Sequence, residues 1–181
     1  MIGSWSAILS NSPSSKLIIR NADLTSMDNQ EYIFEKFKKF NIGKDRLTLL
    51  GRAEHYQFLE TYNMIDIALD SFPYNGGTTT TEAIWQGVPV ITFDGDRWVS
   101  RTSKTLLINT HLSEYVRKDL DDYISFSIKL ANDPSTPDRL RSLRINMREN
   151  IKKSSVYDAK RFTACMEHEF SKIIGHHCCG R

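Results

Sequence analysis

The stretch IDIALDSFPYNGGTTTTEAIWQGVPVITF, residues 65–93, decides the fold that this sequence predicts. Its two ends, residues 65–70 and 88–93, are apolar runs of strand length that are rich in Val, Ile and Leu. A short apolar helix is predicted between them, and Gly87 followed by Pro89 ends that helix. A strand, a helix and a strand at this spacing indicate a βαβ unit with a right-handed crossover, so the two strands should be parallel.

The same alternation continues toward the N-terminus. Two more strands and two more helices are expected, the strands over residues 16–20 and 46–51 and the helices over residues 30–40 and 54–64. Asp28 or Asn29 is the predicted N-cap of the first of these helices. Repeated βαβ units of this kind predict one parallel sheet.

After Gly95 the pattern becomes helical. Helices are expected from Ser100 or Thr102 onward and over residues 120–133, 138–153 and 158–174. These helices would cover or flank the sheet. The predicted fold class is therefore α/β, with a Rossmann-like parallel sheet flanked by helices.

The length and ending of the chain predict its organisation. The 181 residues suffice for one sizeable core but are few for two complete α/β domains. We expect a single Rossmann-like domain over residues 1–175 and a disordered tail over residues 176–181. The tail contains His and Cys, but neighbouring residues enclose one ion poorly, so no metal site is predicted.

Charge and hydropathy exclude several partners. The net charge is only +2 and the basic residues are scattered, which is not a nucleic-acid footprint. No apolar run approaches the ~20 residues of a membrane span, so none is expected. Three cysteines form no disulfide framework, which fits a reducing compartment and a cytoplasmic location.

The glycine- and threonine-rich turn is the candidate ligand site. Residues 71–79 directly follow the strand over residues 65–70, and ligands of open parallel sheets bind at this carboxyl edge. Gly76 and Gly77 lack Cβ atoms, which lets the backbone come close to a ligand. Thr78–Thr81 open the next helix, where free N–H groups and the helix dipole favour an anion. Together these features predict a cradle for a diphosphate.

Glu82 lies one helical turn after Thr78, and a carboxylate there could accept the hydroxyls of a ribose. A structural interpretation stays open, because Thr and Gly are also common in strand-to-helix turns that bind nothing. The turn matches neither G-x-x-x-x-G-K-[ST] nor G-x-G-x-x-G. Triphosphate hydrolysis and nicotinamide binding are therefore disfavoured.

Arg101 begins a helix beyond the strand over residues 88–93. It either meets an anion or forms a salt bridge with Asp94 or Asp96. Asp66 and Asp70 of the preceding strand share one face, and we interpret them as structural.

A series of short motifs runs through this part of the chain. Its members are Asp66, Leu69 and Asp70, then Pro73, Tyr74, Asn75, Gly76, Thr78 and Thr79, then Trp85, Gly87, Pro89 and Thr92, then Gly95, Ser100 and Arg101. In this order the motifs resemble the C-terminal catalytic region of the O-linked N-acetylglucosamine transferases, the SPINDLY-like glycosyltransferases of GT-B fold. Weaker resemblance extends to residues 4–21 and 158–170. The resemblance implies the C-terminal, nucleotide-sugar-binding half of a GT-B enzyme.

The resemblance also implies roles for individual residues. Thr78 and Thr79 would bind the diphosphate of a UDP-sugar, and Glu82 would bind its ribose. Ala53 and His55 would lie near the uracil. The residues that would border the sugar are Tyr74, Asn75, Gly76 and Gly77.

The implied reaction transfers N-acetylglucosamine from UDP-N-acetylglucosamine to a protein Ser or Thr, with inversion and with neither cofactor nor metal. The implied partners are the UDP-sugar, the acceptor protein, and an N-terminal GT-B domain or helical repeats on a longer chain. That second domain is outside this sequence, so we expect the chain to be incomplete or inactive alone. The alternative is a non-catalytic nucleotide-binding or interaction domain from a truncated glycosyltransferase.

Overall fold

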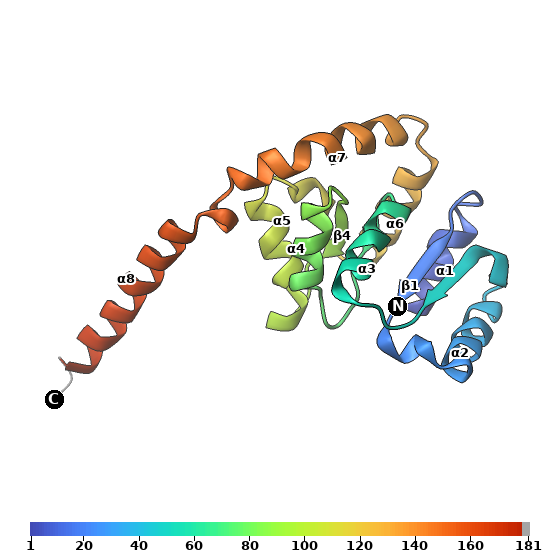
Figure 1. The fold of residues 1–181 in the computed structure, drawn as a ribbon, viewed down its shortest axis with the longest axis horizontal. Coiled ribbons are helices and arrows are strands. Elements are labelled where there is room, and N and C mark those ends of the chain that lie inside the picture. The colour runs from blue at the N-terminus through green and yellow to red at the C-terminus, as the bar shows by residue number, and fades with distance from the viewer. Residues whose placement is uncertain (179–181) are drawn as a thin grey trace.

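The computed structural model describes the backbone of residues 1–178 and the side chains of residues 1–175 (Figure 1). Five strands are present in this part of the chain: β1 (Leu17–Arg20), β2 (Leu47–Leu50), β3 (Ala68–Leu69), β4 (Val90–Phe93) and β5 (Val116–Arg117). The α-helices are α1 (Ile2–Ser10), α2 (Met27–Lys38), α3 (His55–Glu60), α4 (Thr78–Trp85), α5 (Thr102–Asn109), α6 (Leu120–Asn132), α7 (Thr136–Lys152) and α8 (Ala159–Cys178). Short 3-10 turns lie between them: η1 (Ala22–Thr25), η2 (Lys44–Arg46), η3 (Thr61–Met64), η4 (Trp98–Ser100), η5 (Ser113–Tyr115) and η6 (Ser155–Tyr157).

All paired strands are parallel, as predicted. β1 pairs with β2, and β3, β4 and β5 form a second sheet in that order. Strand β4 is central and its residues are buried throughout, which explains its continuous apolar sequence. The strands of both sheets have their carboxyl ends on the same side of the molecule. His55, which follows β2, lies 3.8 Å from Glu82, which follows β3. The predicted α/β class with helices flanking parallel strands is confirmed.

The main core surrounds β4. Helices α4, α5, α6 and α7 each pack apolar side chains against it. Their buried residues in this core are Ala83, Ile84, Leu107, Tyr123, Leu130, Met147 and Ile151. A smaller cluster joins α1 and α2 to β2 through Leu9, Phe37 and Leu47. Figure 1 shows α1, α2 and β1 at one end of the body and α4, α5 and β4 at the other.

Several predicted boundaries are wrong. Helix α2 begins at Met27 with Ser26 as N-cap, so neither Asp28 nor Asn29 is the cap. Asn29 instead donates its side-chain amide to the carbonyl of Asp23, at 2.8 Å. The strand expected over residues 65–70 is paired only at Ala68–Leu69, and β5 was not expected at all.

The helix expected over residues 54–64 divides into α3 and η3. Arg144 of α7 donates hydrogen bonds to the carbonyls of Tyr62 and Ile65, at 3.2 and 2.6 Å. These bonds satisfy carbonyl groups where η3 ends, so a tertiary contact marks that boundary.

Helix α4 ends where the sequence predicted, at a glycine in the left-handed region. Gly87 has φ of +80°, and a Cβ atom there would lie 2.8 Å from the backbone oxygen of Arg144. Glycine is required here both for its backbone angle and for the close approach of α7.

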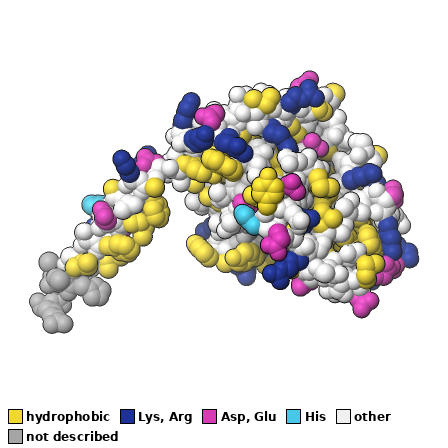
Figure 2. Space-filling model, viewed as in Figure 1, with side chains coloured by type: hydrophobic (Ala, Val, Ile, Leu, Met, Phe, Trp, Pro, Cys, Tyr) yellow, Lys and Arg dark blue, Asp and Glu magenta, His cyan; other side chains and the backbone are white. Residues whose placement is uncertain are grey.

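Helix α8 extends away from the body (Figure 1). Its start follows a stacked contact between Trp85 and Tyr157, whose ring centroids lie 5.4 Å apart. Apolar side chains are exposed along α8, among them Phe162, Phe170 and Ile174, and Figure 2 shows them as a stripe. The helix runs to Cys178, into the first part of the predicted tail, and the rest of that tail lies outside the described residues.

None of the helices in residues 1–178 combines the length and the apolar character needed to cross a membrane.

Candidate functional site

The carboxylate of Asp70 organises the loop that follows β3. Its Oδ1 accepts hydrogen bonds from the backbone N–H groups of Ser71 and Gly76, at 3.1 and 2.9 Å. Its Oδ2 accepts from the hydroxyl of Thr92 on β4, at 2.7 Å. The buried carboxylate of Asp70 therefore holds both ends of the loop over residues 71–77 at the carboxyl edge of the strands.

Burial raises the pKa of Asp70, and the hydrogen bonds from Gly76, Thr92 and Ser71 partly oppose that rise. Asp66 is exposed, so the two aspartates do not form a carboxylate pair. The structural interpretation of Asp70 agrees with these contacts.

Two further contacts hold the loop against its neighbours. The side-chain amide of Asn75 donates to Thr92 at 3.0 Å, and its backbone N–H donates to the carbonyl of Val99 at 2.9 Å. Ser103 of α5 donates to the carbonyl of Gly76 at 2.9 Å and shares a 2.8 Å hydrogen bond with Thr80. Asn75 is thus buried and held by these contacts, and its place beside a sugar, which the resemblance implies, stays a prediction.

Thr78 and Thr79 are exposed at the start of α4. Neither hydroxyl makes a hydrogen bond within the described residues, whereas those of Thr80 and Thr81 are bonded to Ser103 and to the carbonyl of Gly77. The first N–H groups of a helix have no intrahelical partner. Two free hydroxyls and the free amides of the first turn therefore face solvent together, which suits an anion.

Glycine is needed at one of the two positions before α4. A Cβ atom on Gly76 would lie 2.5 Å from Oγ1 of Thr80 and 2.7 Å from Oγ1 of Thr79. A Cβ atom on Gly77 would meet only Cγ2 of Thr102, at an ordinary 3.7 Å. Glycine is therefore required at Gly76 by packing within the loop itself, whereas the approach of the backbone to a ligand, which the sequence predicted for both glycines, stays a prediction.

Glu82 and the loop after β2 meet beside this helix start. His55 Nε2, at the start of α3, lies 3.8 Å from Glu82 Oε1, and Ala53 lies in the loop that leads into this helix. The side chain of His55 is 73% exposed and that of Glu82 only 17%, so the carboxylate is the fixed partner. Below them, the hydroxyl of Tyr62 donates to the carbonyl of Thr79 at 3.0 Å. Burial, with a smaller contribution from Glu82, raises the pKa of Tyr62.

The loop over residues 94–101 borders the site on the other side. Arg101 donates to the carbonyl of Gly95 at 2.8 Å and lies 3.8 Å from Asp94, whose other oxygen binds Lys104 at 2.6 Å. The salt bridge with Asp94 that the sequence suggested is present, and both partners of Arg101 belong to the loop over residues 94–101. Trp98 in the same loop is 80% exposed. Tyr74 is also exposed, at the tip of the loop over residues 71–77.

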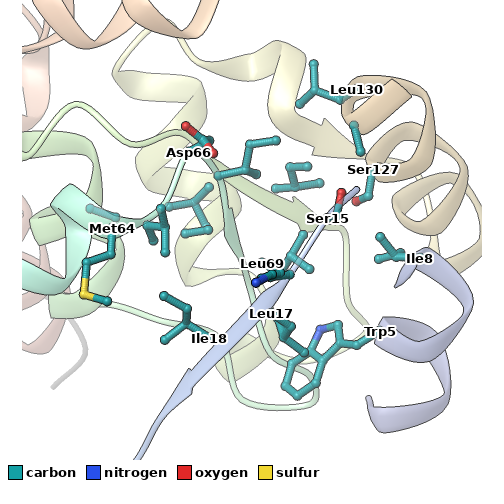
Figure 3. Close-up of a pocket in the computed structure, with 18 of the residues that line it drawn as sticks. Trp5, Ile8, Ser15, Leu17, Ile18, Met64, Asp66, Leu69, Ser127 and Leu130 are labelled. Atoms are coloured by element: carbon teal, nitrogen blue, oxygen red, sulfur yellow. The ribbon is translucent and has the colours of Figure 1, made fainter. Parts of the chain in front are cut away.

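A groove with a volume of about 1110 Å³ adjoins this site. Gly76 and Thr79 are among the residues that line it. Leu17 and Ile18 of β1 and Leu69 of β3 contribute apolar side chains to its wall (Figure 3). No cluster of His, Cys, Asp and Glu suited to a metal ion exists among the described residues.

The sequence predicted the loop and helix start at the carboxyl edge but not the side chains that hold this loop in place. Asp70, Thr92 and Ser103 hold the loop, and each lies on a different element. The position of Asp70 at the end of a strand was visible in the sequence. Its partner Thr92 looked like an ordinary strand residue, and only the parallel register places the two strands side by side.

The fold is that of a parallel α/β domain, and a candidate polar ligand site lies at its strand ends. The family model of glycosyl transferase family 41 matches residues 1–166. This chain belongs to glycosyltransferase family 41.

Similar proteins include a probable UDP-N-acetylglucosamine–peptide N-acetylglucosaminyltransferase SPINDLY of Hordeum vulgare, 30% identical over 97% of this chain and 18% of that protein. The probable transferase SEC of Arabidopsis thaliana is 24% identical over 100% of this chain and 18% of its own length. Among solved structures, a K341M mutant of the Thermobaculum terrenum O-GlcNAc transferase has a TM-score of 0.86 and 31% identity. It covers 94% of this chain, which spans 32% of that structure. The chain thus spans about a fifth of these curated relatives.

Proposed function

We propose that this chain is the part of a glycosyltransferase that binds a UDP-sugar, for which UDP-N-acetylglucosamine is the best candidate. The observation that carries the proposal is the pair of unbonded hydroxyls, Thr78 and Thr79, at the start of α4. They directly follow a loop that Asp70 holds in place. A diphosphate bound there would accept hydrogen bonds from both hydroxyls and from the free amides of the helix.

The same arrangement suggests how the chain would contribute to transfer. In an inverting reaction, a Ser or Thr oxygen of the acceptor protein attacks the anomeric carbon as its bond to the diphosphate oxygen breaks. Negative charge then grows on the departing UDP, so donors at Thr78 and Thr79 would stabilise the transition state more than the bound donor. Neither a cofactor nor a metal is needed for this step, which stays a prediction.

The rest of the nucleotide would lie between the two neighbouring loops. The carboxylate of Glu82 would accept the ribose hydroxyls, while Ala53 and His55 would border the uracil. An acceptor protein and an N-terminal GT-B domain, or helical repeats on a longer chain, would complete the reaction. The names of the relatives, which are peptide N-acetylglucosaminyltransferases, support this division.

Calorimetric titration with UDP tests the cradle. Hydrogen bonds to charged groups contribute about 1.5–3 kcal/mol each, so Thr78→Ala combined with Thr79→Ala should weaken UDP binding at least ~10-fold. Thr81→Ala is the matched control, because its hydroxyl turns back to the carbonyl of Gly77 at 3.1 Å. Unchanged affinity in the double variant, or no UDP binding by the parent chain, would contradict the proposal.

A further inference from the structure

Tyr62 is a buried polar residue that the proposed function leaves without a role. It lies in η3 and is only 7% exposed. Its hydroxyl donates to the backbone carbonyl of Thr79 at 3.0 Å. Burial raises the pKa of this hydroxyl, and the nearby charge of Glu82 raises it further, so it stays protonated as a donor. The hydroxyl thus lies close to the two residues proposed to meet the diphosphate and the ribose.

The ring and the backbone of Tyr62 are both held in place. Phe58 of α3 packs edge-on against the ring, with ring centroids 5.7 Å apart. Arg144 of α7 donates to the backbone carbonyl of Tyr62 at 3.2 Å and to that of Ile65 at 2.6 Å, which ties η3 to α7. Helix α7 also packs against α4, and the backbone of Arg144 closely approaches Gly87 at the end of that helix (Figure 1). The hydroxyl of Tyr62 therefore belongs to a packed frame.

Thr78 and Thr79 begin α4 without side-chain partners. Both residues are exposed, and their hydroxyls make no hydrogen bonds within the described residues. The N–H of Thr81 donates to the carbonyl of Gly77 at 3.0 Å, so the N–H groups of Thr78 and Thr79 precede the hydrogen-bond ladder of the helix. Helix ends fray unless a partner fixes them. Because helical carbonyls point away from the N–H groups of the first turn, Tyr62 fixes the backbone of Thr79 without occupying a donor that a ligand would need.

We propose that Tyr62 is a positioning residue for the anion cradle at the start of α4, a role that rests on the function proposed above. Its hydroxyl holds the backbone of Thr79 so that the hydroxyls and free amides of the first turn are already ordered when the diphosphate of UDP arrives. A site that is ordered in advance loses less conformational entropy on binding and therefore binds more tightly. Arg144 acts one step further away, by holding η3 and with it Tyr62.

Tyr62→Phe tests this role, because the variant loses the hydroxyl and retains the ring that packs on Phe58. NMR relaxation of the ligand-free 181-residue chain measures the order of the first turn. The order parameters of the Thr78 and Thr79 amides should fall from the ~0.85 of rigid backbone toward the ~0.6 of flexible backbone. The amide of Thr81 is the internal reference, since its hydrogen bond to Gly77 remains.

NMR titration of the same variant compares UDP with uridine, which lacks the diphosphate. UDP binding should weaken ~5-fold, whereas uridine binding should change less than ~2-fold. Tyr115→Phe is the matched control, because Tyr115 is also a buried tyrosine but lies in η5, where its ring packs on Phe126 of α6. Its affinity for UDP should equal that of the parent.

The outcomes separate the positioning role from UDP binding itself. If the parent binds UDP, unchanged order parameters or unchanged UDP affinity in Tyr62→Phe would overturn the positioning role alone. Equal losses for UDP and uridine would do the same, as would an equal loss of UDP affinity in Tyr115→Phe, because the hydroxyl would then matter only for the general packing of the fold. If the parent binds no UDP, the proposed function fails, and the positioning role fails with it.

Discussion

A single buried carboxylate links strand β3, strand β4 and the loop that begins the candidate ligand site. Asp70 accepts three hydrogen bonds, and two of them come from backbone N–H groups of the loop itself. Removing the carboxylate would leave buried donors without a partner, which is costlier than the loss of a surface bond. Asp70 therefore holds the loop that leads into α4, at whose start Thr78 and Thr79 are exposed to solvent.

The raised pKa of Asp70 predicts a specific dependence of stability on pH. Because the folded-state pKa lies above the ordinary 3.8, the stabilising contribution is complete below that value and is lost as the pH rises through the raised pKa. Asp70→Asn abolishes this titration. The parent should therefore lose stability relative to the variant on going from strongly to weakly acidic pH.

Urea unfolding of both proteins across this pH range measures the difference. Asp66→Asn is the matched control, since Asp66 is exposed. Parallel profiles for the parent and Asp70→Asn would refute the assignment of the raised pKa to Asp70.

At the scale of elements, the sequence predicted the βαβ unit and the place of its turn because both depend on local patterns. The apolar runs, Gly87 and the threonines at the helix start all act within a few residues. Features set by distant partners were not predictable. The length of β3 depends on its pairing with β4, which involves only Ala68 and Leu69. The end of η3 lies where Arg144 of α7 donates to the carbonyls of Tyr62 and Ile65.

The two glycines before α4 should respond differently to substitution. Gly76→Ala places a methyl group against the side chains of Thr79 and Thr80, so the loop must shift. Overpacking of this kind destabilises by about 1–3 kcal/mol, and the shift should weaken UDP binding at least ~10-fold. Gly77→Ala has room for its methyl group and should bind UDP almost normally. Calorimetry and urea unfolding measure both effects, and similar losses in the two variants would contradict the packing at Gly76.

At the scale of the whole molecule, the body is held by α4–α7 around β4, and α8 stands apart. The described side chains of α8 are exposed, and the helix meets the body mainly near η6. Helix α7, in contrast, buries Met147 and Ile151 in the main core. The sequence predicted α8 as a helix, but its amphipathic pattern did not show that its apolar stripe would lie outside this core.

Deleting residues 159–181 should therefore leave thermal unfolding almost unchanged. The stacked pair Trp85 and Tyr157 is retained, and the midpoint is expected to shift by less than about 2 °C. Met147→Ala with Ile151→Ala in α7 is the comparison, because each truncation should cost about 2–5 kcal/mol. Scanning calorimetry measures both, and a large loss on deleting α8 would mean that its contacts are energetically important.

The hydrogen bond from the Asn75 backbone to Val99 has an optical consequence. This bond joins the loop over residues 71–77 to Val99, which directly follows Trp98 in the chain. The Trp98 side chain is 80% exposed. Trp5 and Trp85 are partly buried against the core, so they are shielded from aqueous quenchers that reach Trp98. The unlabelled protein thus carries its own fluorophore beside the place where a nucleotide would bind, and iodide quenching can follow that loop in solution.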